Sequence, residues 1–177
     1  MNNLGYFIAK VKCRFMHGNK EVINDFFRKN GVKIGEGTKI SSNILSAEPY
    51  LIEIGDNVTI SHGVDFITHD NSVCKLFGVD YDIYGKIVIG NECFIGAHAI
   101  LMYGITLPDR VIVAAGSVVT KSPETGNVII GGNPARVIGS LREFENKVEA
   151  KVIHAGNLSY EEKRQKVLKN IDRWIVR

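Results

Sequence analysis

Histidine is the first residue type to consider for chemistry, because an unperturbed imidazole changes charge close to neutral pH and can act as a general base. The chain has five histidines. His69 differs from the others because it lies at the start of a segment, residues 68–86, that interrupts a regular repeat. Outside such a repeat, a histidine of this kind is more often a solvated loop residue.

Asp70 is the carboxylate next to His69 in the sequence. A carboxylate that accepts the N–H of an imidazole holds the ring in one tautomer. Adjacent residues of an extended chain point to opposite sides, so Asp70 can orient His69 only if the chain turns there. The alternative role for Asp70 is a contact with the substrate, and both roles stay open.

The element that positions His69 is a repeat with a period of six residues. Large apolar residues recur at steps of six in three runs: Ile34 and Ile40; Ile54, Ile60 and Phe66; and Ile89, Ile95, Leu101, Leu107, Val113 and Val119. A second position, mostly small, lies two residues earlier: Thr38, Val58, Val64, Cys93, Ala99, Val111 and Ser117. A period of six fits neither a helix nor an alternating strand. It predicts an all-β solenoid in which three short strands complete each triangular coil and stacked coils share one core.

Two breaks in this period locate irregular segments. The step from Ile40 to Ile54 is 14 residues, and the step from Phe66 to Ile89 is 23 residues. Residues 68–86 must therefore leave the coil as a protruding loop. Loops on a rigid scaffold often carry function, and this one contains His69, Asp70, Asp80, Tyr81, Asp82 and Tyr84.

Both ends of the chain predict short helices. Residues 18–30 place apolar side chains on one helical face and end at Asn30-Gly31, a good helix stop. Ser159-x-x-Glu162 resembles a capping box that starts a last helix. The expected organisation is a helical extension over residues 1–30, the solenoid over 31–139 and a second extension over 140–177. These helices can cap the ends of the solenoid or pack on a neighbouring subunit.

Composition excludes several classes of protein. The net charge is only +3 and the basic residues are scattered, so no nucleic-acid partner is expected. No stretch approaches the roughly 20 apolar residues of a membrane helix, and the apolar patch at residues 6–9 is too short for a signal peptide. We therefore expect no membrane partner. The three cysteines form no CxxC pair, which favours a reducing, cytoplasmic location.

The string IGNECFIGAHAILMYGITLPDRVIVAAGSVVTKS, followed by GGNPARVIG, resembles the hexapeptide-repeat acyltransferases. Within them it is most similar to the galactoside, maltose and polysaccharide O-acetyltransferases. The resemblance covers residues 31–139, and VAAGSVVTK and NPAR are its most specific parts. It implies a left-handed parallel β-helix, a homotrimer with active sites between subunits, and acetyl-CoA-dependent acetylation of a sugar or polysaccharide-precursor hydroxyl.

The resemblance also implies roles for particular residues. His69 matches the position of the family's catalytic base, which deprotonates the acceptor in a direct transfer from acetyl-CoA. The coenzyme A contacts match Ala97, Ala115, Thr120, Lys121 and Arg136. Chemically this set is coherent, because small side chains let backbone amides reach the pantetheine arm and two cations meet the phosphates.

Three alternative functions remain. The first is N-acetylation of a nucleotide-linked amino sugar. The second is a metalloenzyme similar to the γ-carbonic anhydrases, for which His62, Cys93 and His98 are superficially suitable, although that family's pair of histidines five residues apart is missing. The third is a β-helix scaffold without catalysis. We expect acetyl transfer and no metal, because the VVTK segment and His69 in the loop favour acyl transfer over the metalloenzyme. A scaffold would have no need for His69, Lys121 and Arg136 together.

Overall fold

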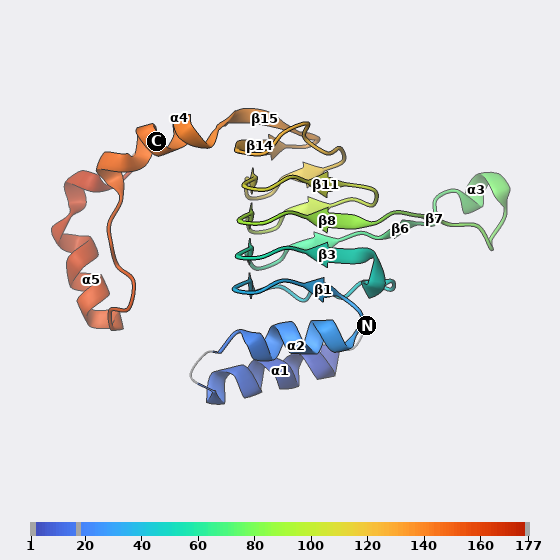
Figure 1. Cartoon of the computed structure of the whole chain (residues 1–177), viewed down its shortest axis with the longest axis horizontal. Coiled ribbons are helices and arrows are strands. Elements are labelled where there is room, and N and C mark those ends of the chain that lie inside the picture. The colour runs from blue at the N-terminus through green and yellow to red at the C-terminus, as the bar shows by residue number, and fades with distance from the viewer. Residues whose placement is uncertain (1–2, 17–18, 176–177) are drawn as a thin grey trace. The chain divides into compact units, whose positions relative to one another are not determined.

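The aliphatic positions of the period-six repeat form short parallel strands that stack in three sheets (Figure 1). The computed structural model describes residues 3–16 and 19–175. The first sheet has the order β1 (Lys33–Ile34), β3 (Ile52–Ile54), β8 (Ile87–Ile89) and β11 (Thr106–Leu107). The third sheet has the order β5 (Asp65–Phe66), β10 (Ile100–Leu101) and β13 (Val118–Val119).

The second sheet is the longest. Its order is β2 (Lys39–Ile40), β4 (Thr59–Ile60), β9 (Phe94–Ile95), β12 (Ile112–Val113), β14 (Val128–Gly132) and β15 (Ala135–Ser140). Only the last pair, β14 and β15, is antiparallel. The chain visits the three sheets in rotation, from β8 to β9 to β10 and then from β11 to β12 to β13. Each of these two passes adds one strand to every sheet.

Both predicted rows of inward residues are confirmed as core. From Ile40 to Val119 the aliphatic row is buried, and so is the row of smaller residues from Thr38 to Ser117. Gly96 shows how tightly successive passes approach at a turn, because a Cβ there would lie 2.5 Å from the backbone nitrogen of Ala115. At another turn a ladder of side-chain oxygens joins the passes: Asp109 Oδ1 accepts from the backbone N–H of Asn91, and Asn91 Oδ1 accepts from that of Asp56.

The paired residues of β11 offer a direct test of this core. Leu107 is fully buried, whereas its neighbour Thr106 points to solvent. We expect Leu107→Ala to lower the free energy of unfolding by about 2–5 kcal/mol, because it removes apolar contacts and leaves a cavity. Thr106→Ala is the matched control and should change it by less than about 1 kcal/mol. Urea denaturation at one protein concentration compares the two, and equal effects would contradict the inward assignment of Leu107.

The two breaks in the period correspond to two irregular segments. The step from Ile40 to Ile54 contains the 3-10 helix η1 (Pro49–Leu51) and no strand of the third sheet. The longer break forms an arm, residues 69–84, which protrudes from the stacked strands (Figure 1). In the arm, β6 (His69–Asp70) pairs antiparallel with β7 (Ile83–Tyr84), and α3 (Cys74–Phe77) lies between them in sequence.

Two helices precede the strands, not one. The predicted helix over residues 18–30 is present as α2 (Glu21–Lys29). It packs on the start of the stack: Phe27 is fully buried, and Asn24 donates a side-chain hydrogen bond to the carbonyl of Thr38 at 2.8 Å. Helix α1 (Asn3–Phe15) lies in the predicted extension over residues 1–30 but outside the predicted helix over residues 18–30. It packs on α2 through Tyr6, whose ring stacks on Phe27 at a centroid distance of 5.6 Å.

The residues from Leu141 onwards form a separate compact unit. It contains α4 (Leu141–Val148), η2 (Glu149–Lys151), α5 (Tyr160–Lys169) and η3 (Ile171–Arg173). The predicted capping box is confirmed, since Ser159 and Glu162 exchange hydrogen bonds at the start of α5. Among the residues that the structure describes, no helix has the length and apolar character needed to span a bilayer.

Candidate active site

His69 lies where the arm leaves the stack, and its ring has a carboxylate partner from the other irregular segment. The Nδ1 atom of His69 lies 2.9 Å from Oε2 of Glu48. The side chain of Glu48 is only 13% exposed, while that of His69 is 38% exposed. With Nδ1 donating its proton to Glu48, the free lone pair is on Nε2. The pair thus provides an oriented, solvent-accessible base.

Glu48 is held in its ionised form. Burial alone raises the pKa of its carboxyl group, but hydrogen bonds from the Thr68 hydroxyl and from His69 outweigh this, and the pKa lies below its ordinary value. The hydroxyl of Thr68 donates to the same Oε2 atom at 2.7 Å. An ionised Glu48 accepts the imidazole N–H and stabilises the positive charge that His69 acquires when it takes a proton.

Asp70 has different partners. Its Oδ1 atom accepts the backbone N–H of Ser72 at 2.8 Å, and its Oδ2 atom accepts the hydroxyl of Tyr103 at 3.3 Å. These hydrogen bonds, led by that of Ser72, lower the pKa of Asp70. Within the described residues no hydrogen bond joins Asp70 to His69. Asp70 therefore forms hydrogen bonds at the start of the arm. Glu48 is the carboxylate that lies beside the imidazole of His69.

A cavity of about 460 Å³ opens beside His69. It is lined by Asn43, Leu45, Ser46, Ala47, Asp65, Phe66, Ile67, Thr68 and His69. The hydroxyl oxygen of Ser46 is buried and has no hydrogen-bond partner among the described residues. An unpaired buried hydroxyl costs free energy unless a ligand satisfies it. Ser46 is therefore a candidate contact for the acceptor substrate.

Sequence reasoning missed both Glu48 and Ser46. They lie in residues 41–51, within the 14-residue step between Ile40 and Ile54. The irregular step was the available signal, because a segment that leaves the repeat can bring polar side chains to the surface of the stack. The spacing locates the break but does not show which of its side chains face His69.

A second cavity, of about 400 Å³, is lined by the two predicted phosphate-binding cations. Lys121 and Arg136 both line it, from the end of β13 and from β15, together with Glu124. Thr120 directly precedes Lys121 at the end of β13. This cavity and the one beside His69 share no lining residue. One chain thus carries the two predicted phosphate-binding cations and the candidate base in separate places.

Ala97 and Ala115 lie one above the other at the turn between the second and third sheets. The carbonyl of Ala97 accepts the backbone N–H of Gly116 at 2.8 Å. The third-sheet strand β13 separates this turn from Thr120 and Lys121. An extended ligand lying along that sheet would pass the alanines at one edge and the cations at the other.

The metal-binding alternative requires at least three suitable ligand side chains close together. In residues 3–16 and 19–175, no group of three or more His, Cys, Asp or Glu side chains is arranged to hold a metal ion. The rings of His62 and His98 lie edge to face, with centroids 4.9 Å apart. Cys93 instead donates its thiol to the carbonyl of Pro108 at 3.2 Å.

Comparison with known proteins identifies the family. Residues 86–121 match the family described as the hexapeptide repeat of succinyl-transferase. The chain is 31% identical to galactoside O-acetyltransferase of Escherichia coli K12, over 64% of this chain and 56% of that protein. It is 42% identical to Protein CapG of Staphylococcus aureus, over 89% of this chain and 92% of that protein. The chain belongs to the hexapeptide-repeat acetyltransferases.

A solved structure supports the same family assignment. A hexapeptide-repeat acetyltransferase of Vibrio cholerae, solved in complex with acetyl coenzyme A, superposes with a TM-score of 0.56 and 32% identity. The match covers 63% of this chain and 61% of that one. The protein is thus an acyltransferase.

Proposed function

We propose that this acetyltransferase transfers an acetyl group from acetyl-CoA to a hydroxyl of a sugar or polysaccharide precursor. The observation that carries the proposal is the hydrogen bond between His69 and Glu48 beside a cavity. A sugar hydroxyl is a weak nucleophile while protonated, and an oriented imidazole can accept its proton as the oxygen attacks. The likeness to a galactoside O-acetyltransferase supports a sugar acceptor.

The proposed transfer is direct, in a complex of enzyme, acetyl-CoA and acceptor. The hydroxyl oxygen attacks the thioester carbonyl carbon while its proton passes to Nε2 of His69. The tetrahedral oxyanion is stabilised by a nearby donor such as a backbone N–H. It then collapses with cleavage of the carbon–sulfur bond, and the coenzyme A thiolate takes the proton back from His69. Ser46 donates to the acceptor, and Asp70 holds the arm in place.

The separate positions of base and cations favour an active site shared between subunits. We propose a left-handed β-helix and a homotrimer, in which the arm of one subunit brings His69 toward the coenzyme A groove of its neighbour. The arm exposes six large apolar or aromatic side chains that a neighbouring surface can cover: Leu76, Phe77, Val79, Tyr81, Ile83 and Tyr84. Such an arrangement makes the oligomer a requirement for activity.

Calorimetry with acetyl-CoA tests the donor. We expect micromolar binding by the wild-type oligomer and about 10–10²-fold weaker binding by Lys121→Ala, because a lost charge-assisted contact to a phosphate costs roughly 1.5–3 kcal/mol. Arg136→Ala should act in the same direction. Lys163→Ala, an exposed lysine in the C-terminal unit, is the matched control.

Either outcome of this titration is informative. Binding that weakens only in the groove variants leads to a panel of sugar and amino-sugar acceptors, which separates O-acetylation from N-acetylation. Absence of acetyl-CoA binding by a correctly folded oligomer would overturn the proposal.

A further inference from the structure

Helix α1 has a second apolar face that is largely exposed. Tyr6, Ala9 and Cys13 pack toward α2. The opposite side of α1 carries five large apolar side chains with exposed fractions between 39% and 82%: Leu4, Phe7, Ile8, Val11 and Phe15. Their spacing of three, four and seven residues makes them one continuous stripe. A stripe of this kind marks an interaction surface.

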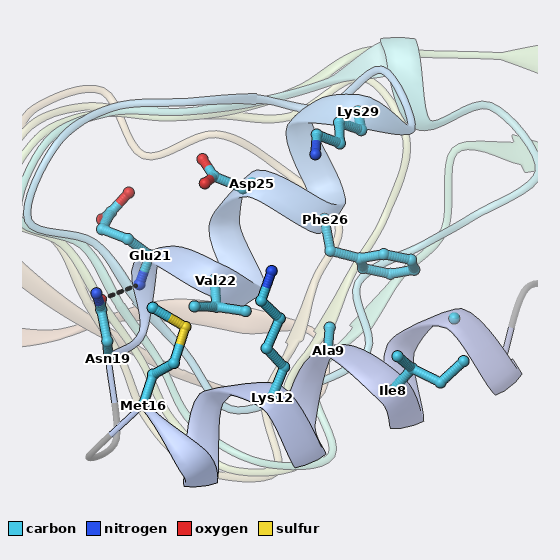
Figure 2. A pocket seen from close by; sticks show the side chains of 11 residues that line it. Ile8, Ala9, Lys12, Met16, Asn19, Glu21, Val22, Asp25, Phe26 and Lys29 are labelled. Carbon is cyan, nitrogen blue, oxygen red and sulfur yellow. Dashed lines mark hydrogen bonds between the residues drawn. The ribbon is translucent and has the colours of Figure 1, made fainter.

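Cations border the stripe on both sides. Lys10 and Arg14, four residues apart, follow one edge, and Lys12 lies at the other edge. Figure 2 shows Lys12 directed from α1 toward α2, over a groove of about 440 Å³ that Ile8 and Phe26 also line. The helix contains no Asp or Glu. An apolar stripe with cations along both edges and no anion is the pattern of a helix that lies in a membrane interface.

A second copy of the same helix fits this face poorly, because it would bring the cations of one copy against those of the other. An anionic bilayer fits both features. Its acyl region accepts the apolar stripe, and its phosphates lie at the depth reached by Lys10, Lys12 and Arg14.

The position of α1 within the fold makes this contact accessible. Helix α2 lies between α1 and the first strands of the stack, so the stripe faces away from the strands at one end of the stack (Figure 1). In the proposed trimer, a threefold axis along the stacking direction would place three copies of α1 at the same end. Three weak contacts on one surface then reinforce one another.

We propose that α1 attaches the enzyme to the surface of an anionic membrane, lying parallel to it without crossing it. This goes beyond the proposed acetyl transfer and departs from the sequence-based expectation of no membrane partner. That expectation concerned segments long enough to span a bilayer. The stripe becomes visible only when the structure shows which face of α1 is occupied by α2.

Flotation with vesicles tests the proposal on the full chain. One set of vesicles contains equal parts of phosphatidylglycerol and phosphatidylcholine, and the other contains phosphatidylcholine alone. We expect the wild type to partition onto the anionic vesicles at least about tenfold better than onto the neutral ones. The double substitutions Phe7→Ser/Phe15→Ser and Lys10→Glu/Arg14→Glu should each lower that partition by at least about tenfold. The matched controls Tyr160→Ser/Ile171→Ser and Lys163→Glu/Lys169→Glu change exposed residues of the C-terminal unit and should leave it unchanged.

Acetyl-CoA binding and the mass of the assembly are measured on every variant. Unchanged values show that a variant is folded, and they separate this test from that of the catalytic proposal. Should the serine variant fail to fold, the charge-reversal variant still decides, because its two side chains are exposed. The proposal is overturned if wild type does not float with anionic vesicles, if the α1 variants float as well as wild type, or if the serine variant changes the mass of the assembly.

Discussion

Replacement of His69 by alanine is expected to lower kcat by about 10²–10⁴-fold, the range by which positioned general bases accelerate proton transfer. The affinity for acetyl-CoA should stay close to that of the wild type, because the substitution leaves the proposed phosphate contacts of Lys121 and Arg136 in place. Steady-state kinetics with the best acceptor from the sugar panel, combined with calorimetry, checks both parts.

The control for this variant is His154→Ala, which removes an exposed imidazole from the C-terminal unit. It should leave kcat unchanged. A His69→Ala enzyme that retains wild-type turnover, with an unchanged thermal midpoint, would show that another group accepts the proton.

Replacement of Glu48 by glutamine is expected to have the second largest effect, lowering kcat by about 10–10³-fold. Glutamine keeps the size of the side chain but removes the charge that stabilises protonated His69. Its amide N–H₂ can also donate to Nδ1 and so favour the wrong tautomer. A role limited to folding would lower kcat at all pH values alike, whereas loss of this positioning residue should also change the pH profile.

The same substitution makes a prediction about stability and pH. The pKa of Glu48 in the folded protein is below its ordinary value. Its interactions therefore stabilise the fold above the unfolded-state pKa of about 4.3, and this contribution is lost as pH falls through the folded-state pKa. The difference in thermal midpoint between wild type and Glu48→Gln should be present at neutral pH and shrink at the acidic end.

Glu53→Gln is the matched control for Glu48→Gln. Glu53 lies in β3 and forms surface ion pairs with Lys33 at 2.6 Å and Lys86 at 2.7 Å. Its loss should leave kcat unchanged. If Glu48→Gln and Glu53→Gln lower kcat equally, Glu48 has no special role beside His69.

The stacked core was predictable because each of its signals is local. A branched aliphatic residue at every sixth position points inward whichever residue lies above it. The rows from Ile40 to Val119 could therefore be assigned without knowing which strands pair. The capping box at Ser159 and the helix ending at Asn30 are equally local signals, and both are present in the structure.

The arrangement around His69 depended on contacts between distant segments. Glu48 and His69 are 21 residues apart and lie in two different breaks of the repeat. Spacing shows that each break leaves the coil, but not where its side chains point. Asp70, the neighbour in sequence, is directed to Ser72 and Tyr103 instead. The exposed apolar face of α1 could not be predicted for the same reason, because the spacing of its residues does not show which side of the helix packs on α2.

The sequence by itself thus determined the repeat, its breaks, the position of His69 at the second break and the family motifs with Lys121 and Arg136. These features follow from residue type and spacing along one chain. Only the tertiary structure decided that Glu48 orients His69, that Ser46 lies unpaired beside it, and that the cations meet in one groove away from the base. Those relations arise because stacking brings residues from separate passes of the chain into contact, and that contact is not encoded in any single local pattern.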